Sequence, residues 1–300
     1  MSLLINSLEQ GLVYGLMALG VLITFRVLDF PDLTVDGSFP MGAGITASLL
    51  VMGWNPVLAI VLGIVGGVLA GTLTGVLSTK LNILNLLAGI LTMTLLYSVN
   101  LRIMGRPNIP LIGRVTLIEQ VNELIEPLGL GRYSTLLFFA VLVLFVKLLL
   151  DLFFNTEIGL ALRATGDNEQ MIKAQGVNTD RMKILGLAIS NGLVALSGGL
   201  VAQYSGFADV GMGIGTIIAG LASVIIGETL LPTKSFRWMT TAVIVGSLIY
   251  RTTIMVALRY GHNFGFKSSD LKLITSMIVI LALAVPQVRG KIDLRFGEET

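Results

Sequence analysis

The sequence predicts an all-α, polytopic transmembrane protein built as a bundle of about nine helices. Two observations lead to this fold class. Of the 300 residues, 54% are hydrophobic and only 13% are charged, whereas a soluble domain carries about a quarter charged residues. Apolar runs of about twenty residues, long enough to cross a bilayer as a helix, also recur along the chain. We therefore expect one transmembrane domain over residues 1–300, surrounded by the lipid bilayer.

The composition also excludes several functions. The net charge of +2 gives no indication of nucleic acid binding. With no cysteine and a single histidine, His262, the chain cannot build a disulfide or a thiolate or histidine metal cluster, and it has little equipment for nucleophilic catalysis. No GxxxxGK[ST] phosphate-binding loop is present either. We expect no catalytic residue, metal or cofactor, and any ATP hydrolysis would take place on another chain.

The apolar runs give the order of the spans. The first has no basic region and no cleavage site before it, so we interpret it as a retained span rather than a signal peptide. The second is short and rich in glycine, and is a candidate for a broken or re-entrant segment. Eight and ten spans remain the alternatives to nine. The expected ranges are 6–25, 39–53, 57–78, 83–104, 135–154, 183–204, 211–229, 239–258 and 271–288.

Lysine and arginine in the loops orient this array, because cytoplasmic loops carry the excess of both. Placing the C-terminus in the cytoplasm gives the inner loops the larger share, and an odd number of spans then puts the N-terminus outside. Residues 105–134 become an external loop, whose amphipathic stretch TLIEQVNELIEPL would lie on the membrane surface or contact an external partner. Residues 159–181 become the long cytoplasmic loop.

The two halves of the chain contain similar segments. The run GLVYGLMALG at 11–20 resembles GLVALSGG at 192–199, and each precedes an acidic break and a glycine-rich stretch. In the topology above these two spans run in opposite directions, as an inverted repeat requires. Biased composition is the alternative explanation of the match.

The cytoplasmic loop has the features of a short helix. Asp167 is expected to be its N-cap, with Gln170 completing a capping box. Glu169 falls in the first turn, where the helix dipole favours an anion, and Gly176 suits the left-handed position that ends a helix. Two turns are marginal alone, so the loop is either an ordinary connection or a helix seated in a partner's groove. The apolar surface it would offer consists of Met171, Ile172 and Ala174.

The segment 29–40, DFPDLTVDGSFP, places carboxylates close to the membrane. Such groups are costly in lipid and indicate a hydrated cavity or a boundary. We expect Asp36 to cap the helix that follows it, by accepting its free amides. Asp36 and Ser38 are also candidates for the border of a translocation path, and the two roles are compatible.

One face of the third expected span consists of glycines at i+4 spacing, which permits close helix packing. That packing would lie within one subunit or form a dimer seam. The residues are Gly63, Gly67, Gly71 and Gly75.

Polar residues within other spans have two interpretations. Arg251 would face a water-filled path or make an internal ion pair or backbone contact. Thr92 and Asn100 would line a path or make hydrogen bonds between helices.

Several stretches resemble a known family. The run GLALRA at 159–164, followed by Asp167-Asn168 and by GVNTDR at 176–181, is similar to the cytoplasmic loop of branched-chain amino acid type permeases of ATP-binding-cassette (ABC) importers. The first span and the run SNGLVALSGGLVAQYSG also match the family pattern. The runs LDFPDLTVDGSFPMGA and LNLLAGILTM resemble the tryptophan/tyrosine transport permease branch. Where branched-chain permeases carry an Asn-Phe-Ala-His-Gly-like string, this chain has Leu33-Thr34-Val35-Asp36-Gly37, which leaves the substrate open.

The resemblance implies a permease subunit of an ABC importer in the bacterial plasma membrane. It would carry a small solute, with amino acids and aromatic amino acids in particular as candidates. It implies a homodimer, an ABC ATPase on the cytoplasmic side and a substrate-binding protein outside. The loop 159–181 then contains the coupling helix, positioned by Arg163 and Asn168, with Met171, Ile172 and Ala174 filling the ATPase groove.

Three other functions are alternatives. An ion-gradient-driven secondary transporter would need intramembrane charges to couple the gradient, and few are present. An intramembrane enzyme would need a nucleophile and a base, and no such pair stands out. A structural membrane scaffold is disfavoured by the capped inner loop.

Overall fold

The computed structural model describes residues 2–125, 131, 133–233, 235–261, 273, 275–277 and 280. This part of the chain is mostly helical, as expected. Its helices are α1 (Ser2–Val21), the π-helical η1 (Leu22–Val27), α2 (Val35–Val51), α3 (Pro56–Thr79), α4 (Asn85–Met104), α5 (Leu117–Ile125), α6 (Ser134–Phe153), α7 (Glu157–Asp167), α8 (Glu169–Ala174), α9 (Thr179–Ser205), α10 (Thr216–Leu230) and α11 (Phe236–Gly261). Two short strands, β1 (Asn108–Pro110) and β2 (Phe207–Asp209), complete it.

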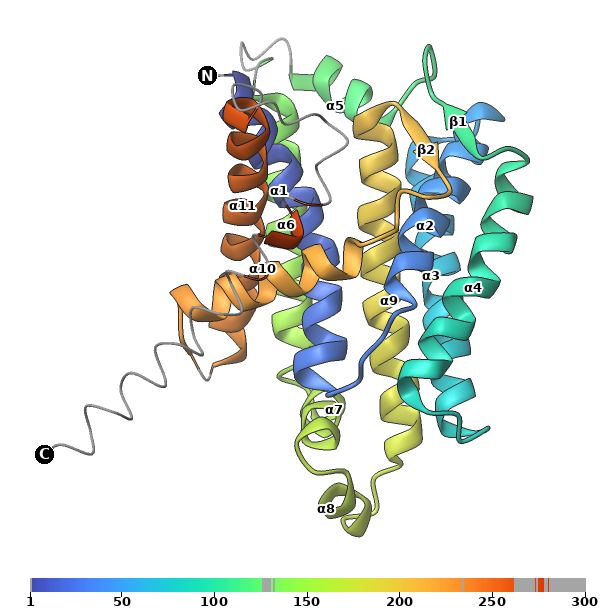
Figure 1. Cartoon of the computed structure of the whole chain (residues 1–300), viewed down its shortest axis with the longest axis vertical. Coiled ribbons are helices and arrows are strands. Elements are labelled where there is room, and N and C mark those ends of the chain that lie inside the picture. Colours follow the sequence, from blue (N-terminus) through green and yellow to red (C-terminus); the bar gives the residue numbers. More distant parts are fainter. Residues whose placement is uncertain are drawn as a thin grey trace, which may run out of the picture.

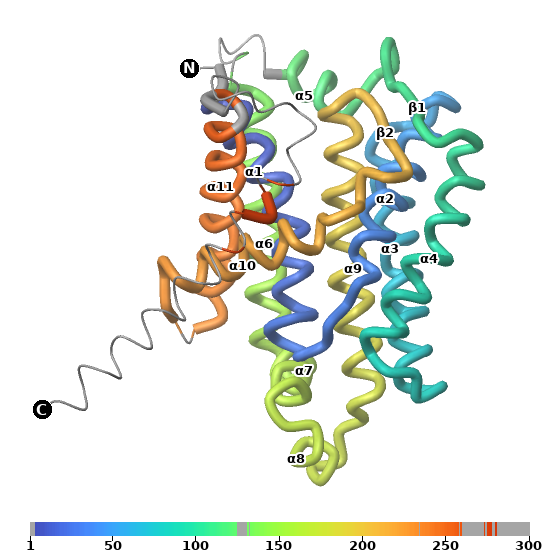
Figure 2. The backbone as a smooth tube through the Cα atoms, viewed as in Figure 1, coloured from blue at the N-terminus to red at the C-terminus, as the bar shows by residue number. Residues whose placement is uncertain are grey.

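The long helices lie side by side along one direction (Figure 1). The strands and α5 lie at one end of this bundle, and α7 and α8 lie at the other. The expected loops 105–134 and 159–181 are therefore at opposite ends. The smooth chain path shows α1 running toward the α8 end and α9 returning from it (Figure 2).

Six of the described helices are long and apolar enough to cross a membrane, by length and composition. They are Leu4–Val27, Pro56–Thr79, Asn85–Met104, Ser134–Phe153, Thr179–Ser205 and Phe236–Ala257. The expected spans 39–53 and 211–229 correspond to α2 and α10, which have only 17 and 15 residues. Most of the ninth expected span, 271–288, lies outside the described residues. The described residues therefore contain six full-length candidate spans, and the count of nine stays a prediction.

Helix α9 lies at the centre of the bundle and packs against α1, α2 and α3. Two serine hydroxyls of α9 donate to backbone carbonyls of α1: Ser190 Oγ to Gly20 O at 2.7 Å and Ser197 Oγ to Val13 O at 2.8 Å. Position 190 lies beside 20 and position 197 beside 13, so the two helices are antiparallel.

The glycine face of α3 lies against α9 and α2. A Cβ added at Gly67 would lie 2.3 Å from Asn191 O, and one at Gly71 would lie 2.1 Å from Leu187 O. Both distances are far below van der Waals contact, so only glycine permits this helix separation. Gly75 faces Ile184 of α9 in the same way, and Gly63 faces Thr46 and Gly42 of α2. This face is covered within the subunit.

The end of the bundle opposite α8 contains a small sheet, an element absent from the expected all-helical fold. β1 and β2 pair antiparallel, with Asn108 opposite Asp209. The pairing joins the segment after α4 to the segment after α9. The described part of the amphipathic stretch forms α5, which begins with a capping box: Thr116 N–H donates to Glu119 Oε2 at 3.0 Å, and Glu119 N–H donates to Thr116 Oγ at 3.2 Å.

Candidate functional site

Helix α8 projects from the end of the bundle as an ordered two-turn element (Figure 1). Its N-cap is Asn168, whose Oδ1 accepts from Met171 N–H at 3.0 Å. The expected N-cap, Asp167, is instead the last residue of α7. The expectation was wrong by one residue because Asn168 leaves the helical region (φ −157°, ψ 95°) and so separates the two helices.

The C-terminus of α8 is closed by a Schellman motif. Gly176 has φ +85°, the left-handed conformation that favours glycine. Its N–H donates to Lys173 O at 3.0 Å, and Val177 N–H donates to Ile172 O at 3.3 Å. Both ends of this short helix are therefore satisfied by local hydrogen bonds.

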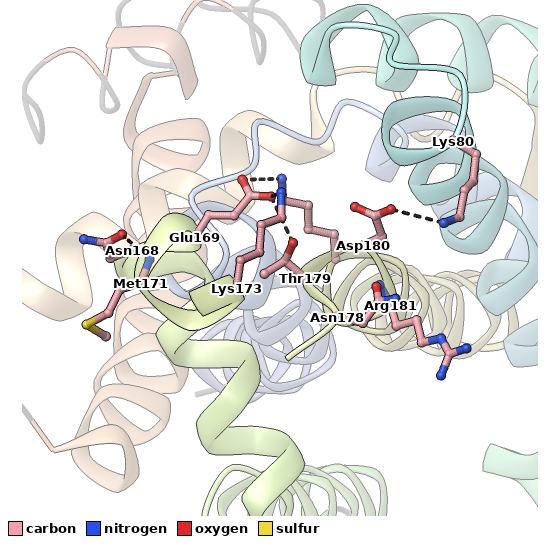
Figure 3. Close-up of polar contacts among 10 residues, drawn as sticks. Lys80, Asn168, Glu169, Met171, Lys173, Asn178, Thr179, Asp180 and Arg181 are labelled. Carbon is pink, nitrogen blue, oxygen red and sulfur yellow. Dashed lines mark hydrogen bonds and ion pairs between the residues drawn. The ribbon is translucent and has the colours of Figure 1, made fainter. Parts of the chain in front are cut away.

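Glu169 joins α8 to the first turn of α9 (Figure 3). Its carboxylate is 2.8 Å from Lys173 Nζ and 2.7 Å from Lys183 Nζ, and it accepts from Thr179 Oγ at 3.1 Å. The hydrogen bond from Lys173 and then that from Lys183 lower the pKa of Glu169 to about 2. The same pairing raises the pKa of Lys173. The sequence placed Glu169 in the first turn but gave no sign of its partners on α9.

A second ion pair joins the start of α9 to α3. Lys80 Nζ, at the C-terminal end of α3, lies 3.1 Å from Asp180 Oδ2 (Figure 3). α8 is thus linked to α9, and the beginning of α9 is linked to α3.

The outer surface of α8 differs from the expected one. Met171 is 48% exposed and Ala174 is also exposed. Ile172 is only 6% exposed, because it packs inward within this chain, and it leaves little surface for a partner. Arg163 lies on α7, with its guanidinium carbon 5.7 Å from the centroid of the Phe236 ring at the start of α11.

The centre of the bundle contains a second polar assembly, at the start of α10. Asp36, in the first turn of α2, accepts hydrogen bonds from Gly215 N–H, Thr216 Oγ and Ile217 N–H, each at 2.9 Å. Asp36 therefore caps α10, and the expectation that it caps its own helix was wrong. The side chain points across to α10, whose N-cap Gly215 cannot act as a cap itself because it has no side chain.

Buried polar groups also connect α9 to the segment before α2. Asn191 Nδ2 donates to Asp32 Oδ2 at 2.7 Å, and Asn191 Oδ1 accepts from Ser38 Oγ at 2.7 Å. Asp32 Oδ1 accepts from Thr34 N–H at 2.9 Å, and Thr34 Oγ lies 2.7 Å from Thr74 Oγ of α3. The sequence did not indicate this pairing, because Asp32 and Asn191 are 159 positions apart.

A cavity of about 330 Å³ borders α2, α4 and the segment before α10. Asn100 is 1% exposed and lines this cavity, and its Nδ2 donates to Gly37 O at 3.0 Å. The complete lining is Asp36, Gly37, Pro40, Met93, Thr94, Tyr97, Ser98, Asn100, Val210 and Ile214.

The other expected path residues lie elsewhere. Ser38 is fully buried against Asn191. Thr92 is fully buried and donates within α4, to Ala88 O at 3.0 Å. Arg251 borders a different cavity of about 340 Å³, with its guanidinium carbon 3.2 Å from the centroid of the Tyr14 ring. Of the five, the structure brings only Asp36 and Asn100 to one cavity.

Comparison with known proteins gives a family match over nearly the whole chain. The model of the branched-chain amino acid transport system permease component family matches residues 3–285. A tyrosine transport system permease protein of Clostridioides difficile (strain R20291) is 49% identical over 284 residues, which cover 95% of this chain and 91% of that one. An uncharacterized protein of Rickettsia prowazekii (strain Madrid E) is 34% identical over 197 residues, 65% of this chain and 66% of the other. The solved structure of PsaBC from Streptococcus pneumoniae in complex with Fab has a TM-score of 0.47 and 18% identity, covering 92% of this chain and 89% of that one.

Proposed function

Since this chain belongs to the branched-chain amino acid transport system permease component family, we propose that it carries an aromatic amino acid across the bacterial plasma membrane. The substrate class is supported by the 49% identity to a tyrosine transport system permease protein over 95% of the chain. Membership of this family favours a transport subunit of an importer over an enzyme. It also favours an ABC importer over a secondary transporter. An ABC ATPase would supply the energy from a separate chain.

The proposed coupling to the ATPase rests on one observation, the structure of α8. It is a short helix capped at both ends and tied to α9 by Glu169, with Met171 and Ala174 exposed. An isolated helix of this length would be marginal, so its two caps and its tie to α9 favour a preformed docking element. We assign the α8 end to the cytoplasm, with the N-terminus outside and the C-terminus inside.

Nine spans and an inverted repeat fit this assignment. α1 and α9, which carry the two similar segments, are antiparallel. Each is followed by an irregular segment and then by a helix shorter than a full span, α2 or α10. Asp36 joins the starts of these two short helices, and discontinuous helices of this kind border substrate sites in transporters.

The translocation path would run along the face formed by α2, α4 and the start of α10. Polar side chains of α4 are exposed there, among them Thr94 and Ser98. Polar side chains facing lipid are costly, so a second copy of the chain would cover this face. The resulting homodimer would receive substrate from an external binding protein and bind an ATPase at each α8. Ser38, Thr92 and Arg251 would then act through packing rather than by contacting the solute.

Capture of the ATPase tests this assignment. The purified chain should retain a nucleotide-hydrolysing subunit, and Ala174→Glu on α8 should abolish that association. Val115→Glu adds the same charge at an exposed position at the opposite end of the bundle and should leave it intact. Equal loss with both variants would remove α8 from the interface. Uptake on an ion gradient alone, with no ATPase captured, would favour the secondary transporter.

A further inference from the structure

We propose that the cavity between α2, α4 and the start of α10 binds the ammonium group of the transported amino acid, with Asn100 Oδ1 and Asp36 as its acceptors. This inference rests on the proposed function, because it assumes that the solute carries a protonated amine. It goes beyond that function by specifying the group of the solute that is recognised inside the membrane and the atoms that recognise it.

Asn100 supplies a buried acceptor. Among the described residues its Oδ1 has no hydrogen-bond partner, although the side chain is only 1% exposed. The amide cannot be reversed to satisfy it, because Nδ2 donates to Gly37 O at 3.0 Å and the exchanged oxygen would face that carbonyl. A buried acceptor without a partner is unfavourable, so a donor that reaches Asn100 Oδ1 would remove this cost.

Asp36 supplies the negative charge next to it. Asn100 donates to the carbonyl of Gly37, the residue directly after Asp36, and Asp36 and Asn100 both line the same cavity. The Asp36 carboxylate accepts three hydrogen bonds from the start of α10. A carboxylate offers about four lone-pair sites, which leaves one free, and the α10 dipole offsets only about half of its charge.

The lining of the cavity selects a cation with an apolar body. None of the described residues that line it is lysine, arginine or histidine. Within the part of the chain that the structure describes, the basic side chains that form ion pairs are bonded to carboxylates other than Asp36. Most of the remaining wall is apolar or aromatic, with Met93, Tyr97 and Ile214 among its residues. The volume of about 330 Å³ lies at the lower end of the range for small-molecule sites, which suits a single amino acid.

The absence of cysteine from the chain permits a direct test of this charge preference. Ser98→Cys places one thiol on the cavity wall, and Val115→Cys places one on the exposed surface near α5. Both variants, reconstituted in liposomes, are reacted with a cationic and an anionic methanethiosulfonate reagent. We expect the cationic-to-anionic rate ratio at position 98 to exceed that at 115 by about tenfold or more. Equal ratios, or no reaction at position 98 with either reagent, would overturn the proposal.

Protection by solute tests the acceptors. Tyrosine at millimolar concentration should slow labelling of Ser98→Cys severalfold, whereas 3-(4-hydroxyphenyl)propionate, which lacks the amine, should not. Adding Asn100→Leu should abolish the protection, while Asn85→Leu, the same change on α4 outside the cavity, should preserve it. Protection by both compounds, or protection that survives Asn100→Leu, would refute amine recognition.

These experiments distinguish a failure of the ammonium site from a failure of the proposed function. ATP-driven tyrosine uptake with no charge preference at position 98 would leave the proposed function intact and reject the ammonium site. A cationic preference with protection by another amine, and no tyrosine uptake, would retain the site and reject the aromatic substrate.

Discussion

Replacing Asp36 with asparagine tests whether this side chain caps α10 rather than α2. In Asp36→Asn the amide oxygen can keep the two bonds that Oδ1 accepts from Thr216 Oγ and Ile217 N–H. The new NH2 group would then face Gly215 N–H, where Oδ2 now accepts at 2.9 Å. The variant replaces one charge-assisted hydrogen bond by a contact between two donors.

The loss of stability can be worked out from the two interactions that the substitution removes. A hydrogen bond to a charged group contributes about 1.5–3 kcal/mol. A negative charge at a helix N-terminus contributes about 0.3–1 kcal/mol, and up to about 2 when partly buried. We therefore expect Asp36→Asn to destabilise the protein by about 2–4 kcal/mol. Ser38→Ala, two residues along the same helix, removes a neutral hydrogen bond and should cost less.

Thermal unfolding in detergent and amide hydrogen exchange together measure this effect. Exchange should rise at Gly215 and Ile217, the amides that Asp36 now accepts from, and not in the first turn of α2. An unchanged unfolding temperature would refute the capping argument. Faster exchange in α2 with α10 unaffected would instead support the role expected from the sequence.

Two further outcomes follow from the packing at the α8 end and along α3. The pKa of Glu169, lowered from 4.5 to about 2, means that its ion pairs contribute fully above about pH 4.5 and are lost as the pH falls toward 2. Because the Glu169 side chain is 34% exposed, Glu169→Gln at neutral pH should cost only about 1 kcal/mol of stability. The loss should be seen as faster amide exchange in α8, whereas Glu157→Gln, at an exposed position, should cause no such change. Equal exchange in the two variants would contradict the role of Glu169 in holding α8 to α9. Gly71→Ala places a Cβ 2.1 Å from Leu187 O and should destabilise the protein by about 1–3 kcal/mol. In the control Gly15→Ala, the added Cβ lies 3.9 Å from its nearest neighbouring atom, so this variant should be neutral or slightly stabilising. Comparable unfolding temperatures for the two variants would refute the tight α3–α9 packing.

The sequence predicted the parts of this structure that depend on local pattern. The apolar runs located α1, α3, α4, α6, α9 and α11, because twenty apolar residues determine a helix in lipid without reference to neighbours. The i+4 glycines marked the face of α3 that packs closely. Capping chemistry predicted α8, and the error of one residue between Asp167 and Asn168 arose because both residue types favour the N-cap.

The parts that the sequence did not predict depend on contacts between distant segments. Asp36 lies about 180 positions before the amides it caps, so a local interpretation assigned it to the helix that contains it. Strand pairing of residues 108–110 with 207–209 has the same cause. Asn100 and Arg251 both resembled path residues, yet they border different cavities. Periodicity indicates which residues share a helix face, and not which helix that face meets.

These long-range contacts converge on α9. Glu169 holds α8 to its first turns, and Asn191 halfway along it contacts Asp32 and Ser38. Asp36, two residues before Ser38, holds the start of α10 and borders the cavity. Since α3 and α9 are in backbone contact at their glycine face, α9 cannot bend locally without losing that packing. We therefore expect a displacement of α8 to move α9 together with α3, and Asn191 to pass that movement to α2 and the cavity.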